Sequence, residues 1–276
     1  MPRGGTRRSS VGHSKPAPRG DERRGLGGDQ VEGRQAVREL LLAGRRRVRE
    51  LWIVSGERAE RGPLHDVAEL AQELRVTIKF VSQGKLDAAA RSEAPQGVLA
   101  RCAPLPEADL DELAESVTGE PPFLIALDGV TDPGNFGALL RAAECCGATG
   151  VVVPRHRSVH VTPTVAKAAA GAIEHLPIAV VGGLPAALER LAKLGVWTVG
   201  LDSGASERID QLGLADQPVV LVLGAEGRGL SQLVRRRCEV VVAIPLRGRV
   251  GSLNVAAAGA IACYEVARRR LDAGSS

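Results

Sequence analysis

The sequence predicts an α/β protein whose parallel β-sheet is covered by helices on both faces. In residues 123–272, short Val-rich runs that are apolar on both faces alternate with amphipathic helical patterns, which is typical of a buried parallel sheet. Polar residues follow three of these runs, at the edge where such sheets bind ligands. A smaller α/β pattern precedes this unit, and a chain of 276 residues is long enough for about two domains.

The first segment, residues 1–29, is predicted to be a disordered basic tail. It carries seven basic and three acidic side chains, which accounts for the whole net charge of +4. Gly, Pro, Ser and Arg dominate it and apolar residues are scarce, as in disordered segments. The tail is either a solvated leader or a non-specific electrostatic tether to RNA, and the sequence favours neither interpretation.

Residues 30–103 are predicted to form the small α/β unit. Its basic surface is a run of four arginines between the first helix and the first strand: Arg45, Arg46, Arg47 and Arg49. Charge runs are usually solvated loops, but guanidinium groups beside a tight turn can also hold phosphate oxygens bidentately. We favour an RNA-binding role for these four. The expected helical segments are 36–41, 64–74 and 86–91, and the expected strands are 50–55, 76–81 and 97–102.

Residues 104–122 are predicted to be a linker, with room for a short helix, because prolines open and close the segment around an acidic stretch. The larger unit follows it. Its expected strands are 123–127, 150–153, 178–181, 196–201, 219–223 and 240–244. Its expected helices are 136–146, 163–175, 184–194, 230–238 and 254–270.

Three loops after strands of this unit carry the candidate site. The first strand is followed by a helix with Asn135 in its first turn and Arg141 off its apolar stripe. A later Gly-rich turn contains one carboxylate, Glu226, and a basic loop leads to Ser252 and Asn254 at the start of the last helix. Neither a dinucleotide fingerprint nor an ATP-type phosphate loop occurs in the sequence. These loops therefore favour another nucleotide-like ligand.

Each of these polar residues also has a structural interpretation. Asn135 and Ser252 are suitable helix caps, and Glu226 could pair with Arg228 or Arg235. A capped tight turn explains one such loop well, but it explains three polar loops less well.

Composition limits the remaining possibilities. With 44% hydrophobic and 25% charged residues, the chain has the composition of a globular protein with a real core. No run approaches the roughly 18 apolar residues of a membrane helix, and the N-terminus lacks the apolar core of a signal peptide, so we expect a cytoplasmic protein. The five cysteines form no CxxC pair and the five histidines show no ligand spacing, so neither a disulfide framework nor a metal site is expected.

The motifs in the three loops resemble a known family. The segments LDGVTDPGNFGALLRAAECCGATGVVVP, LVLGAEGRGLS and IPLRGRVGSLNVAAAGAIACYE are similar to the three successive motifs of the SpoU-type, or TrmH-type, RNA 2′-O-ribose methyltransferases. The segment VTPTVAKAAAGAI and the small unit ending in PQGV resemble the branch that methylates a guanosine of large-subunit (23S) ribosomal RNA.

The resemblance implies S-adenosylmethionine as cofactor, ribosomal RNA as partner, a homodimer and a deep trefoil knot in the C-terminal part. It also implies that the N-terminal unit is an RNA-binding domain similar to ribosomal protein L30e. The matching functional polar positions are Asn135, Arg141, Glu226, Ser252 and Asn254. The positions expected to line the cofactor cleft are Gly224, Ile244, Leu253, Gly200 and Leu201.

The chemistry of this reaction indicates what Arg141 does. A ribose 2′-hydroxyl is a poor nucleophile at neutral pH, whereas a sulfonium methyl is already activated, so the enzyme must mainly position and polarise the hydroxyl. Because a guanidinium stays protonated, we expect Arg141 to stabilise the developing alkoxide or to bind the adjacent phosphate. Two alternative functions remain, a methyltransferase for transfer RNA and a catalytically silent RNA-binding protein of ribosome assembly.

Overall fold

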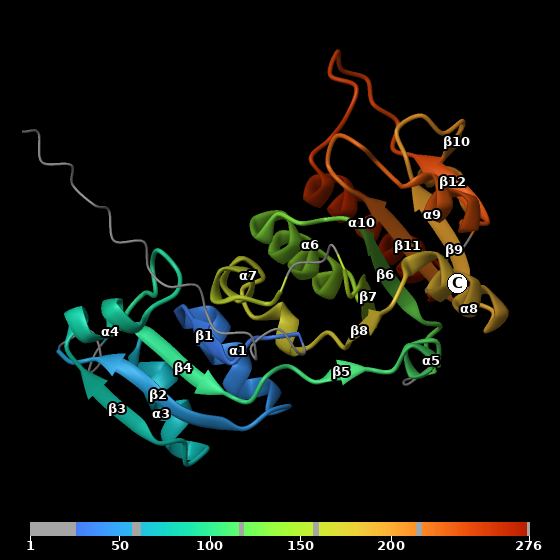
Figure 1. The fold of residues 1–276 in the computed structure, drawn as a ribbon. Helices are drawn as coiled ribbons and strands as arrows, with labels where there is room; N and C mark the ends of the chain where they lie inside the picture. Colours follow the sequence, from blue (N-terminus) through green and yellow to red (C-terminus); the bar gives the residue numbers. More distant parts are fainter. Residues whose placement is uncertain (1–25, 57–61, 116–118, 157–159, 214–216, 275–276) are drawn as a thin grey trace, which may run out of the picture.

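The structure is a computed structural model that describes residues 26–56, 62–115, 119–156, 160–213 and 217–274. In these residues the chain forms a small N-terminal unit and a larger C-terminal unit that lie in contact (Figure 1). Most of the predicted basic tail, residues 1–25, lies outside the described residues. Its last four residues belong to the fold, since Leu26 is buried and Gly27 forms an isolated parallel bridge with Val161. The tail is therefore shorter than predicted, because Leu26 packs into the core of the protein.

The N-terminal unit is built on a four-stranded sheet with the order β1-β4-β2-β3. β1 pairs antiparallel with β4, whereas β2 pairs parallel with β3 and antiparallel with β4. Each helical segment and strand predicted for this unit is present. The short first strand was not predicted, because three residues are too few to show a period. The bounds are β1 Gln30–Glu32, α1 Arg34–Ala43, β2 Val48–Val54, α3 His65–Glu73, β3 Ile78–Val81, α4 Gln83–Ala89 and β4 Val98–Cys102.

The segment predicted as a linker, residues 104–122, is partly built into the larger sheet. β5 (Glu107–Ala108) pairs in parallel with β8 (Ile178–Val181), and the short helix α5 (Leu110–Leu113) follows it. The structure corrects the prediction because Leu105 and Leu113 are buried and hold the segment against the fold. The prolines and acidic residues that dominate its composition concealed these two apolar anchors.

The C-terminal unit confirms the predicted parallel sheet with helices on both faces. Within the described residues its strands have the order β10-β12-β9-β11-β6-β7-β8-β5, and every pairing is parallel. The strands not yet given are β6 Phe123–Asp128, β7 Gly150–Pro154, β9 Trp197–Leu201, β10 Glu207–Arg208, β11 Val219–Gly224 and β12 Val240–Ala243. The helices are α6 Pro133–Cys145, α7 Pro163–Ala168, α8 Leu184–Lys193, α9 Gln232–Arg237 and α10 Val255–Gly274, with 3₁₀ turns η1 Ala172–Glu174 and η2 Ile209–Gln211.

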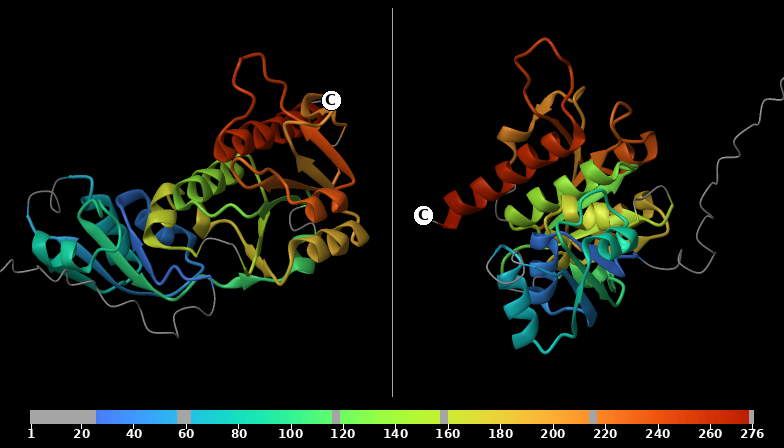
Figure 2. Two further views of the ribbon diagram at one scale, coloured as in Figure 1. Left: turned by 45° about the horizontal axis from the view of Figure 1, so that its top comes forward. Right: turned by 90° about the vertical axis from the view of Figure 1, so that its left-hand side faces the viewer.

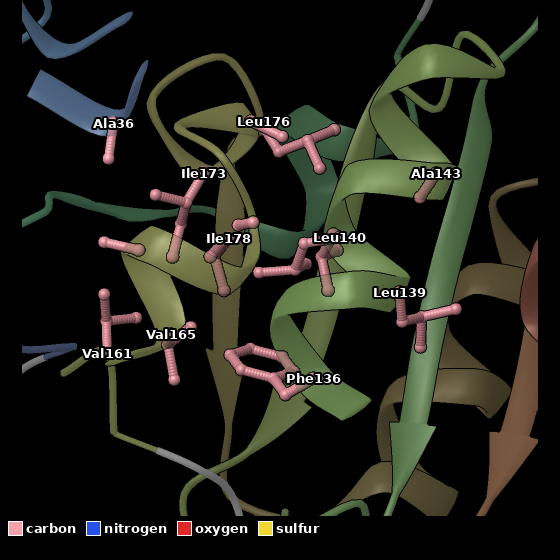
Figure 3. Close-up of a cluster of buried hydrophobic side chains, with 14 of the residues drawn as sticks. Ala36, Phe136, Leu139, Leu140, Ala143, Val161, Val165, Ile173, Leu176 and Ile178 are labelled. Atoms are coloured by element: carbon pink, nitrogen blue, oxygen red, sulfur yellow. The ribbon is translucent and has the colours of Figure 1, made fainter. Parts of the chain in front are cut away.

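Both faces of the large sheet are packed. Along β6, Phe123, Ile125 and Leu127 face one buried cluster, while Leu124 and Ala126 face the other. This alternation follows from the two-residue period of a strand. The first cluster includes α6, α7 and η1 and continues to Ala36 of α1 in the N-terminal unit (Figure 3). The hydrophobic core therefore runs across the junction between the two units.

One predicted helix is broken. Residues 163–175 were expected to form a single helix, but α7 ends at Ala168 and the chain turns through Ala170 and Gly171, whose φ angles are 49° and 88°. A Cβ atom on Gly171 would lie 2.4 Å from the Cβ of Glu39 on α1. The helix breaks because this close approach to α1 requires glycine in a left-handed conformation.

An ion pair fixes the junction of the two units. Arg46 donates from Nε and Nη2 to the carboxylate of Glu174 at 2.9 and 2.5 Å, and the two side chains are 2% and 1% exposed. Nη1 of Arg46 also donates to the carbonyl oxygens of Gly28 and Ala103. Arg46 was predicted to bind RNA, and this prediction is wrong because its guanidinium is buried and all three of its nitrogen atoms donate inside the protein.

Candidate active site

No helix in the described ranges is both long and apolar enough to cross a membrane.

A pocket of about 270 Å³ lies at the carboxyl ends of β9, β11 and β12, the edge predicted to bind a ligand. Four of the five residues predicted to contact a cofactor line the pocket: Leu201, Gly224, Ile244 and Leu253. Gly200 does not line it. Gly200 is buried in β9, where an added Cβ would lie 2.8 Å from Leu230 and 2.9 Å from the Cys238 sulfur, so its small size serves packing behind the pocket.

The Gly-rich turn after β11 forms one wall of this pocket. The N–H of Gly229 donates to the carbonyl of Ala225 at 2.9 Å and closes the turn. A Cβ on Gly224 would lie 2.1 Å from the carbonyl carbon of Gly229, so only glycine lets the two ends of the turn meet. The result is a wall made largely of main-chain groups, which can approach a ligand closely.

Three of the predicted polar residues form one cluster beside this turn, which we call the amide–carboxylate cluster: Asn135, Glu226 and Asn254. Asn135 Nδ2 donates to Glu226 Oε2 at 3.1 Å. Asn254 Nδ2 donates to Asn135 Oδ1 at 2.9 Å and to Glu226 Oε1 at 3.5 Å. α6, the β11–α9 turn and the start of α10 each supply one member, so the three motifs meet in space.

The helix caps differ from the structural alternatives considered from the sequence. Asp132 caps α6 by accepting from the N–H of Asn135 at 2.7 Å, so Asn135 is not the cap. The Oδ1 of Asn254 accepts from the N–H groups of Ala256 and Ala257 at 2.9 and 3.3 Å and thereby caps α10. Ser252 is exposed and lines the pocket instead. Arg235 pairs with Asp202, which leaves Glu226 to the cluster.

Arg141 lies apart from the pocket. It is exposed on α6, six residues beyond Asn135, which corresponds to a rise of about 9 Å along the helix. No hydrogen bond or ion pair joins its guanidinium to another residue in the described ranges. The structure therefore brings together Asn135, Glu226 and Asn254, places Ser252 on the pocket wall, and leaves Arg141 free on the neighbouring surface.

Two carboxylates near the pocket were missed in the sequence. Asp128, at the end of β6, accepts from the N–H of Ser231 at 2.6 Å and lines a second hollow of about 580 Å³ on the other side of the Gly-rich turn. Asp202 lines the first pocket and also accepts from the N–H of Gly204 at 2.8 Å. Both directly end or follow a strand, so their position in the sequence was the available signal.

The cysteines are spread over the chain, and none of them lines the pocket. Burial is the main cause that raises the pKa of all five cysteines, to about 11 for Cys102 and Cys238, so the thiols stay protonated at neutral pH. In the part of the chain that the structure describes, no group of three or more His, Cys, Asp or Glu side chains could hold a metal ion.

The arginine run of the N-terminal unit divides into two pairs. Arg45 donates to the main-chain carbonyl of Glu174 at 3.1 Å and Arg46 is buried beside it, so both serve the junction. Arg47 and Arg49 are exposed and line a separate hollow together with Arg75. Arg75 was not singled out in the sequence, because it lies 26 positions beyond Arg49.

Comparisons with known proteins agree with these motifs. The model of the SpoU rRNA Methylase family matches residues 122–264, and a model described as RNA 2′-O ribose methyltransferase substrate binding matches residues 30–108. A putative TrmH family tRNA/rRNA methyltransferase of Bacillus subtilis is 39% identical over 89% of this chain and 98% of its own length. A 23S rRNA (guanosine-2′-O-)-methyltransferase of Pseudomonas putida is 39% identical over 88% of this chain and 97% of its own.

A solved structure has a similar fold over most of the chain. It is the SpoU methyltransferase AviRb from Streptomyces viridochromogenes in complex with AdoMet, which covers 88% of this chain and 90% of that chain. The TM-score is 0.73 and the sequence identity is 27%.

Proposed function

The chain belongs to the SpoU rRNA methylase family, and from this premise we propose that it transfers a methyl group from S-adenosylmethionine to a ribose 2′-hydroxyl of RNA, at a guanosine of 23S ribosomal RNA. The observation that carries the proposal is the meeting of Asn135, Glu226 and Asn254 at the edge of the pocket. Relatives that match nearly their whole length bear the names of such enzymes, which supports the same substrate for this chain.

The pocket residues fit S-adenosylmethionine. A volume of about 270 Å³ is near the lower end of ligand pockets, about 300 Å³. Leu201, Ile244 and Leu253 offer apolar surface for a purine ring, and the main chain of residues 224–229 offers donors and acceptors for its polar groups. The bound cofactor supplies an activated sulfonium methyl. The protein then has to bring a hydroxyl to it and exclude water.

The polar residues divide this task. Glu226 and the two asparagines form a fixed hydrogen-bonded group that can orient the target ribose, and Ser252 lies beside them on the pocket wall. Arg141, without a partner among the described residues, is available to the RNA. We assign to it the stabilisation of the developing alkoxide or the binding of the adjacent phosphate, because a guanidinium is a cationic donor suited to both.

We also propose that the active form is a homodimer joined through α10. This helix packs along α6 (Figure 2). It bears Ile261, Tyr264 and Leu271, whose exposed fractions are 43%, 63% and 72%. Their spacing makes one apolar stripe, which a second copy can cover by twofold symmetry. Tyr264→Glu is expected to yield monomers in analytical ultracentrifugation, and an unchanged sedimentation coefficient would contradict this assignment.

The finer features of the fold are part of the proposal. β9 separates β12 from β11, whereas α10, the next element after β12, packs against α6 and β11. Residues 244–254 must therefore cross back beside the Gly-rich turn, which supports a deep trefoil knot despite the rarity of knots. We likewise propose that the N-terminal unit is an RNA-binding domain similar to ribosomal protein L30e. The cytoplasmic location stays a prediction.

Transfer of labelled methyl groups tests the proposed function. The assay uses S-adenosylmethionine with undermethylated large-subunit rRNA, with transfer RNA in parallel, and maps the modified nucleotide. We expect a 2′-O-methylguanosine in the ribosomal RNA that is lost with Arg141→Ala. Label on transfer RNA alone would keep the reaction and overturn the substrate. Cofactor binding without any transfer would favour the silent RNA-binding alternative.

A further inference from the structure

A separate hollow, in the N-terminal unit, is lined by four arginines, three of them with exposed side chains. It measures about 380 Å³ and lies where the end of α1, the start of β2 and the end of α3 meet. The exposed Arg47, Arg49 and Arg75 line it beside uncharged residues such as Leu74 and Thr77, and no carboxylate of the described residues is in its lining. The buried Arg46 also borders the hollow, but its charge is paired with Glu174. The hollow therefore concentrates positive charge.

None of these three guanidinium groups is paired with a carboxylate in the described part of the chain. No hydrogen bond, ion pair or aromatic contact joins any of them to another described residue, whereas Arg45 and Arg46 beside them are bonded to Glu174. Three like charges around one hollow repel each other, and an anion between them removes that cost. The arrangement therefore has room for a negatively charged ligand.

The backbone has an unusual conformation at Arg49 and at Arg75, which a solvated loop would not require. The pairing of β2 with β4 shifts register between Val48 and Glu50, so Arg49 occupies a β-bulge, a feature that redirects a side chain. Arg75 has a φ of 56° at the end of α3, where the N–H of Val76 closes the turn onto the carbonyl of Ala71 at 2.8 Å. Glycine usually occupies this position of a helix end, and arginine there is strained.

We propose that Arg47, Arg49 and Arg75 bind the phosphodiester backbone of the substrate RNA at a second contact, separate from the methyl-transfer pocket. This inference rests on the proposed function, because it takes RNA as the substrate. No aromatic side chain lines the hollow, so it holds phosphates and does not read bases. Several guanidinium forks around one opening suit a run of phosphates, and the contact supplies affinity without sequence selectivity.

A purely structural role makes a different prediction for the same residues. The hollow adjoins the carboxyl ends of α1 and α3, where cations interact favourably with the helix dipoles. If that were their whole purpose, replacing the arginines would lower stability and leave RNA affinity unchanged.

Arg75→Gly separates the two roles. Glycine relieves the left-handed strain, so we expect the melting temperature to rise by about 2 to 4 °C. We expect the affinity for a large-subunit rRNA fragment to fall about threefold to tenfold, with the slope of log Kd against log salt smaller by about 1. A more stable protein with unchanged RNA affinity would overturn the proposal.

The double variant Arg47→Gln with Arg49→Gln strengthens the test. Its salt slope is expected to fall by about 2 units. Arg236→Gln is the control for the loss of one positive charge, because Arg236 is exposed on α9 without a described partner and lies in the other unit. Equal losses in the control and the double variant would show a general charge effect and overturn the site. Competition by millimolar inorganic phosphate as strong as that by RNA would assign the hollow to a free anion and also overturn it.

The outcome is independent of the methyl-transfer assay. RNA binding is measured by filter retention or fluorescence anisotropy without S-adenosylmethionine, and transfer is measured separately. Loss of RNA affinity in both N-terminal variants supports the site even if the wild-type chain methylates no tested RNA, in which case only the proposed function fails. Normal transfer by wild type, with unchanged RNA binding by both variants, overturns the site alone.

Discussion

The protein contains two polar clusters that each join distant parts of the chain, and they differ in burial. Arg46 and Glu174 are 128 positions apart, and their side chains are 2% and 1% exposed. Asn135 and Glu226 are 91 positions apart, and Asn254 is 119 positions from Asn135, yet this cluster lies at an open pocket. The first holds the two units together, and the second presents polar groups to a ligand.

The difference shows that hydrogen-bond capacity, more than residue type, separates structural from functional polar groups. Arg46 uses Nε, Nη1 and Nη2 inside the protein, so nothing remains for RNA. The members of the amide–carboxylate cluster bond one another and still have exposed atoms. A buried, saturated pair is costly to break singly, whereas an exposed cluster can change with little loss of stability.

Breaking the buried pair should have the largest effect. Arg46→Met leaves the Glu174 carboxylate buried without its cation, so we expect the free energy of unfolding to fall by about 3 to 5 kcal/mol. Urea unfolding of the variant and of wild type measures this difference in the free energy of unfolding. The double variant Arg46→Met with Glu174→Leu is expected to recover most of the loss, and Arg47→Met, on the exposed side, should change stability by less than about 0.5 kcal/mol. A mild effect of Arg46→Met alone would contradict the structural role.

Altering the exposed cluster should affect the reaction and not the fold. Glu226→Gln keeps the shape but removes the charge, and we expect methyl transfer to fall about tenfold to a hundredfold, or about 1.4 to 2.7 kcal/mol in the activation free energy. Stability should stay within about 0.5 kcal/mol of wild type. Single-turnover transfer and urea unfolding on the same samples make the comparison. A variant that unfolds as readily as Arg46→Met would abolish the distinction between the clusters.

Asn254 belongs to both categories, because Oδ1 caps α10 and Nδ2 joins the cluster. Asn254→Ala should lower both transfer and the free energy of unfolding, the latter by about 1 kcal/mol. Asn254→Ser retains a cap and is expected to restore stability while transfer stays low. If serine restored transfer as well, capping would be the whole role of this residue.

Glu50 forms a third polar cluster with Lys79, Trp52 and Arg101, and its exposure lies between those of the other two. Replacing Glu50 should give the smallest change in stability. The hydrogen bond from Lys79 is the main cause that lowers the pKa of Glu50 from 4.5, with Trp52 and Arg101 contributing. A depressed folded-state pKa stabilises the protein above the unfolded pKa, and this contribution is lost as the pH falls through the folded value. Glu50→Gln should therefore cost stability at pH 7 and converge with wild type as the pH falls below the folded-state pKa of Glu50. A constant difference across that range would rule out the linkage.

Several features of the site could be predicted from the sequence. Glu226 and Asn254 follow strands, and the carboxyl ends of parallel strands meet at one edge, so their approach to Asn135 was foreseeable. The sequence could not decide whether Asn135 and Ser252 cap their helices, because Asp132 and Asn254 close by are equally good candidates. In the structure, Asp132 and Asn254 are the caps. The position of Arg141 outside the pocket also could not be predicted, since helix periodicity places it off the buried face but not relative to a distant loop.

The sequence by itself determined most strands and helices of both units, the parallel sheet and the loops that carry the chemistry, because these depend on short-range periodicity and on turn residues. The tertiary structure alone decided the fate of Arg46, the break at Gly171 and the strand inside the predicted linker. Each depends on a neighbour far along the chain: Glu174, Glu39 and β8. Contacts at such separations leave no periodic signal, so only the folded chain reveals which polar groups are buried and which remain free to bind.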